Sequence, residues 1–92
     1  MKFYHGTSLE AWEEIQREGV LWGIRNAPSR CTYLTPDEAV ATIYGGVILE
    51  AEYDPLPGVG VTNNYRPDSW QMRVYEPIPI KNVKFLYKLS NF

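Results

Sequence analysis

Two helix-start signals, set in a chain that otherwise reads as short strands, constrain the fold most. Residues 7–10 (Thr-Ser-Leu-Glu) form a capping box, in which a Thr stands three residues ahead of a Glu. The apolar stripe that follows predicts a helix over residues 9–18, and Gly19 ends it. Residues 35–38 (Thr-Pro-Asp-Glu) repeat the signal, with Thr35 as the cap and a proline in the first turn. This second helix is expected to end at the Tyr-Gly-Gly of residues 44–46.

The remaining segments have the composition of strands. β-Branched and aromatic residues cluster between turn residues, which predicts strands at 3–4, 32–34, 47–53, 70–75 and 83–89. Pro77 and Pro79 separate the last two, and residues 56–68, dense in Pro, Gly and Asn, are predicted to be a loop. Strands and helices do not alternate regularly. The pattern therefore favours an α+β fold of mainly antiparallel strands with two short helices.

Length and charge exclude several classes of protein. With 92 residues there is room for one hydrophobic core, so we expect a single domain over residues 1–92. A net charge of −2 without runs of like charge disfavours nucleic-acid or membrane binding driven by electrostatics. Cys31 is the only cysteine, and one histidine cannot supply a His/Cys metal cluster. No segment has the apolar length of a signal peptide or membrane helix, so we expect a cytoplasmic protein without membrane or metal partners.

The single histidine is the first candidate for chemistry. His5 lies in a Tyr-His-Gly-Thr segment at a predicted strand end, and Gly6 lets a ligand or another backbone approach closely. The alternative is a histidine with a purely structural role, the commoner situation for a lone histidine.

Two tyrosines form the second candidate. Tyr33 lies in the Thr-Tyr-Leu-Thr segment that runs into the second helix, and Tyr44 follows eleven residues later near the end of that helix. Two tyrosines on either side of a slot can stack a flat heteroaromatic ring, with their hydroxyls at the rim. The alternative is that both are core aromatics, since the chain contains seven tyrosines.

Taken in order, these motifs resemble the ADP-ribosyltransferase superfamily, in particular its diphtheria-toxin-like branch with a His-Tyr-Glu triad. The resemblance covers nearly the whole chain. It implies a small split β-sandwich around a cleft for NAD+, the donor substrate. It further implies that His5 contacts the ribose next to nicotinamide, that the Gly6 backbone contacts the carboxamide, and that Tyr33 and Tyr44 flank the ring. Thr7 and Leu34, which belong to the same two motifs, are expected to line the donor site.

The chain departs from the family pattern at two positions. Many relatives carry a serine for the carboxamide in the helix between the tyrosines, where this chain has Ala41. The family's catalytic glutamate lies on a late strand, and Gln71 takes its place here. The strand pattern supports this position, because alternation puts Gln71 on the face opposite Met72 and Val74. A surface glutamine is the alternative, and Asp68 and Glu76 are substitute carboxylates.

The functional expectations follow from the resemblance. Arg25 and Arg30 lie where relatives carry the loop that covers the donor, and guanidinium groups suit its pyrophosphate. We expect an NAD-dependent ADP-ribosyltransferase with His5, Tyr33 and Gln71 in the catalytic roles and a macromolecular target, protein rather than nucleic acid. One alternative is an NAD- or ADP-ribose-binding module, or a protein-binding inhibitor, that lacks the chemistry. A second is an RNA 2′-phosphotransferase-like enzyme.

Overall fold

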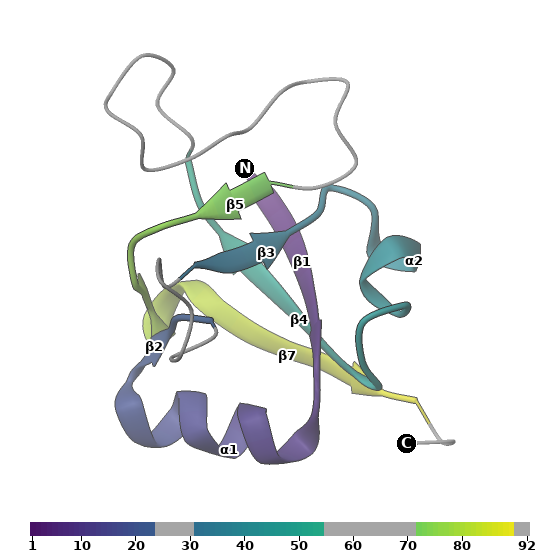
Figure 1. The fold of residues 1–92 in the computed structure, drawn as a ribbon, viewed down its shortest axis with the longest axis horizontal. Coiled ribbons are helices and arrows are strands. Elements are labelled where there is room, and N and C mark those ends of the chain that lie inside the picture. The colour runs from purple at the N-terminus through teal and green to yellow at the C-terminus, as the bar shows by residue number, and fades with distance from the viewer. Residues whose placement is uncertain (24–30, 55–71, 90–92) are drawn as a thin grey trace.

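Short strands and two helices make up the computed structural model, which describes residues 1–23, 31–54 and 72–89 (Figure 1). In chain order the elements are β1 (Lys2–Thr7), α1 (Leu9–Glu18), β2 (Val20–Leu21), β3 (Thr32–Leu34), α2 (Glu38–Ala41), β4 (Val47–Glu52), β5 (Met72–Val74), β6 (Ile78–Pro79), the 3-10 turn η1 (Ile80–Asn82) and β7 (Val83–Lys88). The predicted α+β class is confirmed.

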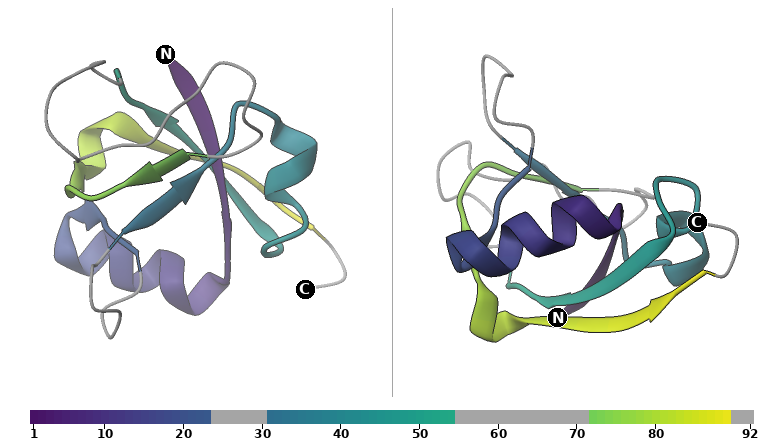
Figure 2. Two further views of the ribbon diagram at one scale, coloured as in Figure 1. Left: turned by 45° about the horizontal axis from the view of Figure 1, so that its top comes forward. Right: turned by 90° about the horizontal axis from the view of Figure 1, so that it is seen from below.

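The strands of the described residues pair antiparallel in three groups. β1, β4 and β7 form a sheet in the order β1-β4-β7, while β3 pairs with β5 and β2 pairs with β6. The register of β4 on β7 shifts between Ile48 and Leu49, which leaves Leu86 as an extra residue on β7. The β3–β5 pair lies over the three-stranded sheet, and α1 runs across one end of these layers (Figures 1 and 2).

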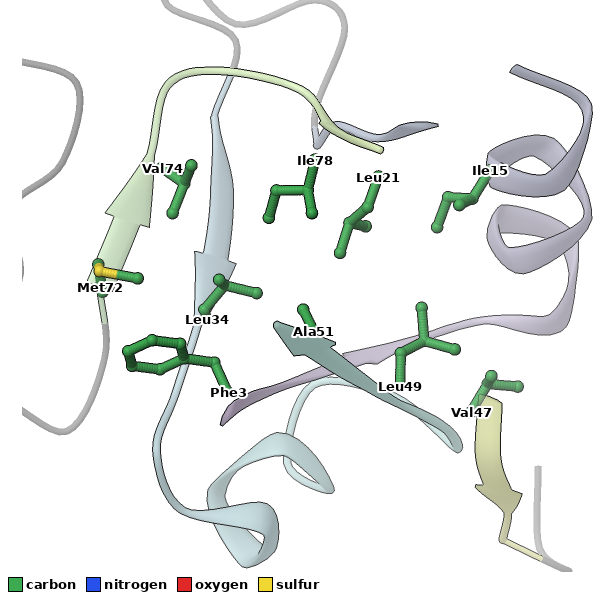
Figure 3. Close-up of a cluster of buried hydrophobic side chains, with 10 residues drawn as sticks. All are labelled: Phe3, Ile15, Leu21, Leu34, Val47, Leu49, Ala51, Met72, Val74 and Ile78. Carbon is green, nitrogen blue, oxygen red and sulfur yellow. The ribbon is translucent and has the colours of Figure 1, made fainter. Parts of the chain in front are cut away.

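The core fills the space between these layers (Figure 3). Alternation along β4 turns Val47, Leu49 and Ala51 to the same face, where Phe3 of β1 lies opposite Ala51. Side chains from every strand group and from α1 complete this cluster: Ile15, Leu21, Leu34, Met72, Val74 and Ile78. At roughly 1.5–3 kcal/mol for each large apolar side chain removed from water, this burial holds the layers together.

The first helix spans residues 9–18 as predicted but has a different cap, and the second helix begins later than predicted. Ser8, not Thr7, caps α1, and its hydroxyl accepts a hydrogen bond from the Ala11 N–H at 3.1 Å. Thr7 is unavailable because it ends β1 and pairs with Val47. The cap of α2 is Asp37, not Thr35.

The physical reason at α2 is a strand contact. Thr35 is buried and bridged to Tyr4, and its hydroxyl accepts from the Asp37 N–H at 3.1 Å. Asp37 is left to cap the helix, accepting from the Ala39 N–H at 2.9 Å. The helix proper then spans only Glu38–Ala41 and continues as a turn to residue 44.

The last third of the chain contains a short strand where the sequence predicts only a proline-rich separator. Ile78 and Pro79 form β6, which pairs with Leu21 and Val20, although the prolines predicted only a separator. Pro79 fits because a proline is tolerated on so short an edge pairing. The strand predicted at 70–75 is described as β5, with Met72 and Val74 buried and Arg73 exposed, as the alternation predicts. The predicted loop at 56–68 lies outside the described residues.

Candidate functional site

A cavity of about 700 Å³ opens where β1 and β3 separate. Its volume falls in the range of pockets that bind small organic molecules. β1, α1, β3 and the end of α2 all contribute to its wall. The residues expected from the sequence that line it are His5, Gly6, Thr7, Tyr33, Leu34, Ala41 and Tyr44.

β1 and the end of β3 are joined by one isolated antiparallel bridge, between Tyr4 and Thr35, and they separate beyond it. The Tyr4 N–H donates to the Thr35 carbonyl at 2.7 Å, and the Thr35 N–H donates back to the Tyr4 carbonyl at 3.0 Å. Continued pairing would place Gly6 opposite Tyr33, but the bridge is an isolated one. Instead, Nδ1 of His5 lies 2.8 Å from the carbonyl oxygen of Tyr33. A side chain thus replaces the backbone contact where the cavity opens.

The hydrogen bond of His5 fixes its tautomer. A carbonyl oxygen only accepts hydrogen bonds, so Nδ1 carries the proton and donates it to Tyr33. Burial lowers the pKa of His5, and the bond to the Tyr33 carbonyl opposes this only in part. The imidazole is therefore neutral at pH 7, and Nε2 offers a lone pair. In the cavity, that lone pair can accept a hydrogen bond from a ligand hydroxyl.

The two candidate tyrosines are placed at the cavity but not in the core. Tyr33 is 39% exposed on β3 and Tyr44 is 51% exposed after α2, whereas the core side chains of the described residues are at most 8% exposed. Both tyrosines therefore line the cavity and keep part of their aromatic side chains exposed. This arrangement argues against the alternative that both are ordinary core aromatics.

The structure does not address three of the expected site residues. Gln71, Arg25 and Arg30 lie outside the described residues, as does the substitute carboxylate Asp68. The other substitute, Glu76, is described. Its carboxylate accepts a hydrogen bond from the Tyr53 hydroxyl at 2.6 Å, and Glu76 is not among the described residues that line the cavity.

Sequence reasoning missed the wall that α1 contributes. Glu10, Glu14 and Glu18 line the cavity, and Glu14 also bonds Arg17 at 3.3 Å. Their spacing of four residues, which puts side chains on one helix face, was the available signal. Trp22 and the buried Cys31 complete another part of the wall, where Thr32 Oγ1 accepts from the Gly23 N–H at 2.8 Å. No sequence pattern marked these residues.

Neither a metal site nor a membrane-spanning helix occurs in the described part of the chain. Residues 1–23, 31–54 and 72–89 contain no group of three or more His, Cys, Asp or Glu side chains that could hold a metal ion. None of the described helices has the length and apolar character needed to cross a membrane.

Comparison of the chain with models of known families, with curated proteins and with solved structures finds no match.

Proposed function

We propose that this chain is an NAD-dependent ADP-ribosyltransferase domain that acts on a macromolecular target, with the nicotinamide end of NAD+ in the cavity. One observation carries the proposal. His5, Tyr33 and Tyr44, separated by up to 39 positions in the sequence, line the same cavity, and His5 bonds the backbone of Tyr33. Antiparallel layers on two sides of one core support the split β-sandwich of that superfamily.

Each residue has a role suited to its chemistry. Nε2 of His5 accepts a hydrogen bond from a hydroxyl of the ribose next to nicotinamide, which requires the neutral imidazole. Tyr33 and Tyr44 flank the nicotinamide ring, and the Gly6 backbone bonds its carboxamide. Thr7, Leu34 and Ala41 complete the wall. The family resemblance implies that Arg25 and Arg30 bind the pyrophosphate.

The reaction is a substitution at the anomeric carbon of that ribose. The bond from this carbon to the nicotinamide nitrogen breaks, and its electron pair leaves with neutral nicotinamide. A nucleophile of the target then bonds the carbon, and its proton passes to water. Positive charge builds on the ribose in the transition state, so binding that is stronger there than in the ground state accelerates the step. Gln71 steadies the ribose hydroxyl in this scheme but adds no negative charge.

The second candidate function, a binding module for NAD+ or ADP-ribose, is favoured by Gln71 itself. A missing carboxylate is expected to slow the reaction by about 10²- to 10³-fold. The two functions make opposite predictions for variants of this residue. A transferase releases nicotinamide as the wild type and slows in Gln71→Ala. A binding module releases none until Gln71→Glu restores the charge.

The experiment that tests the proposal uses NAD+ labelled on the adenylate phosphate. The protein is incubated with it in a cell extract, while free nicotinamide is measured alongside label bound to macromolecules. The transferase proposal predicts both products and their loss in Tyr33→Ala. Binding of NAD+ without release in the wild type, together with release in Gln71→Glu, would support the binding module. Equal binding and equal turnover in wild type, Gln71→Glu and Gln71→Ala would remove Gln71 from the site.

A further inference from the structure

Two glycines lie where β1 meets the turn after α2, and neither leaves room for a side chain. A Cβ atom on Gly6 would overlap the carbonyl oxygen of Ala41 and lie 2.8 Å from its carbonyl carbon. A Cβ atom on Gly45 would overlap the carbonyl oxygen of Thr7 and lie 2.7 Å from its nitrogen. Backbone atoms cannot turn aside as the end of a long side chain can. Glycine is therefore required at both positions for the two backbones to touch.

The close contact of Gly6 with Ala41 also involves the backbone of Tyr44. The carbonyl oxygen of Ala41, the atom that faces Gly6, accepts a hydrogen bond from the Tyr44 N–H at 3.1 Å. Ala41 is 1% exposed, so this carbonyl belongs to a closely packed part of the fold. The backbone of Tyr44 is thereby placed relative to β1.

The preceding residue of β1 acts on the other tyrosine. His5 bonds the carbonyl of Tyr33 at 2.8 Å, so two consecutive residues of β1 each fix one side of the cavity. His5 does so through its ring, and Gly6 does so through the absence of a side chain.

We propose that Gly6 and Gly45 are positioning residues, whose backbone contact sets the separation of Tyr33 and Tyr44 and thus the width of the slot for the nicotinamide ring. The inference rests on the proposed function and deepens it. It gives Gly6 a steric role beside the carboxamide contact that the family resemblance implies. The steric role acts through Tyr44, whereas the carboxamide contact does not need Tyr44.

The test separates these roles with a double-mutant cycle. Affinity for NAD+ and for nicotinamide is measured in wild type, Gly6→Ala, Tyr44→Ala and the double variant. Gly6→Ala is expected to weaken binding at least tenfold when Tyr44 is present and less than twofold in Tyr44→Ala. Gly45→Ala should behave in the same way. Equal losses in both backgrounds would overturn the positioning role.

A second readout needs no ligand. With 3-fluorotyrosine incorporated, the ¹⁹F NMR signal of Tyr44 is identified by its loss in Tyr44→Phe. Gly6→Ala and Gly45→Ala should shift this signal, and an unshifted signal in either folded variant would contradict the inference. Gly19→Ala is the matched control, because a Cβ there has nothing within 4 Å and its φ of 77° adds strain at the C-terminal end of α1. It should lower stability but leave the signal and the affinity unchanged.

One further variant covers the case in which the glycine variants do not fold, and one combination of outcomes separates the positioning role from the proposed function. If both glycine variants fail to fold, Asp37→Ala loosens α2 without adding atoms, because it removes the 2.9 Å cap on the Ala39 N–H. It should shift the Tyr44 signal and weaken binding, and wild-type behaviour would overturn the inference. If the wild type binds neither NAD+ nor nicotinamide while the glycine variants still shift the signal, the proposed function fails and the positioning stands.

Discussion

At the residue scale, His5 combines a structural and a chemical role in one ring. Nδ1 ties β1 to β3 by its bond to the Tyr33 carbonyl, where backbone pairing stops. The bond leaves Nε2 as the acceptor, and burial keeps the ring neutral by lowering its pKa. The two interpretations offered by the sequence, a structural histidine and a ligand-binding one, are therefore compatible.

The lowered pKa of His5 predicts how stability depends on pH. The unfolded chain takes up a proton near the ordinary pKa of 6.5, whereas the folded state takes it up only at lower pH. The contribution is complete above pH 6.5 and is lost as the pH falls through 6.5 toward the folded pKa. Urea unfolding between pH 7.5 and about 5, above the range of most carboxyl groups, should show this decline.

The control is His5→Gln, which has no titrating ring. Because the chain has one histidine, this variant should show a nearly flat free energy of unfolding over the same range. An equal slope in both proteins would mean that another group is responsible and that folding does not lower the pKa of His5.

At the element scale, β1 decides where both helices begin. Thr7 continues the pairing with β4 and Thr35 is bridged to Tyr4, so Ser8 and Asp37 become the caps. This places α1 along the cavity and the end of α2 against Gly6. The elements around the cavity are thus positioned by one strand.

The cap of α1 gives a stability prediction. Ser8→Ala removes the acceptor of the 3.1 Å hydrogen bond from the Ala11 N–H and should lower the free energy of unfolding by about 1 kcal/mol. Ser8→Asp retains an acceptor and should stay near wild type in urea denaturation. If both variants lose the same stability, the cap lies elsewhere.

The hydrogen bond between Tyr53 and Glu76 predicts that Glu76 is not the replacement catalytic carboxylate. Glu76→Gln should change the rate of nicotinamide release less than twofold, because its carboxylate bonds the Tyr53 hydroxyl at 2.6 Å. Tyr53→Phe removes the donor of this hydrogen bond and should lower the free energy of unfolding by about 0.5–1 kcal/mol, whereas Glu76→Gln keeps an acceptor oxygen. A tenfold slower release in Glu76→Gln alone would place this carboxylate at the reaction.

At the scale of the whole molecule, local signals predicted more of the fold than contacts across it. Helix α1, the alternation of Met72 and Val74 and the fold class followed from spacing and side-chain type. The true caps depended on the pairing partners of Thr7 and Thr35, which lie far away in the sequence. Strand β6 was not predicted because its partner, Val20–Leu21, is equally short and lies far away in the sequence.

In the candidate site, too, local sequence signals predicted some residues, while others depend on contacts between distant parts of the chain. Residue type and order were enough to predict His5, Tyr33 and Tyr44 as site residues, and all three line the same cavity. The glutamates of α1, with Trp22 and Cys31, also line it, which the sequence pattern did not reveal. Tertiary packing thus decided the rest of the wall.

The central claim, that this cavity binds the nicotinamide end of NAD+, is tested most directly by thermal unfolding with NAD+. A ligand at one hundred times its Kd stabilises the folded state by about 2.7 kcal/mol, so the melting temperature of wild type should rise by several degrees. Tyr33→Ala should remove the rise. Tyr87→Ala, a control at a tyrosine that is not among the described cavity residues, should retain it. No rise at millimolar NAD+, or an equal rise in Tyr33→Ala, would contradict the claim.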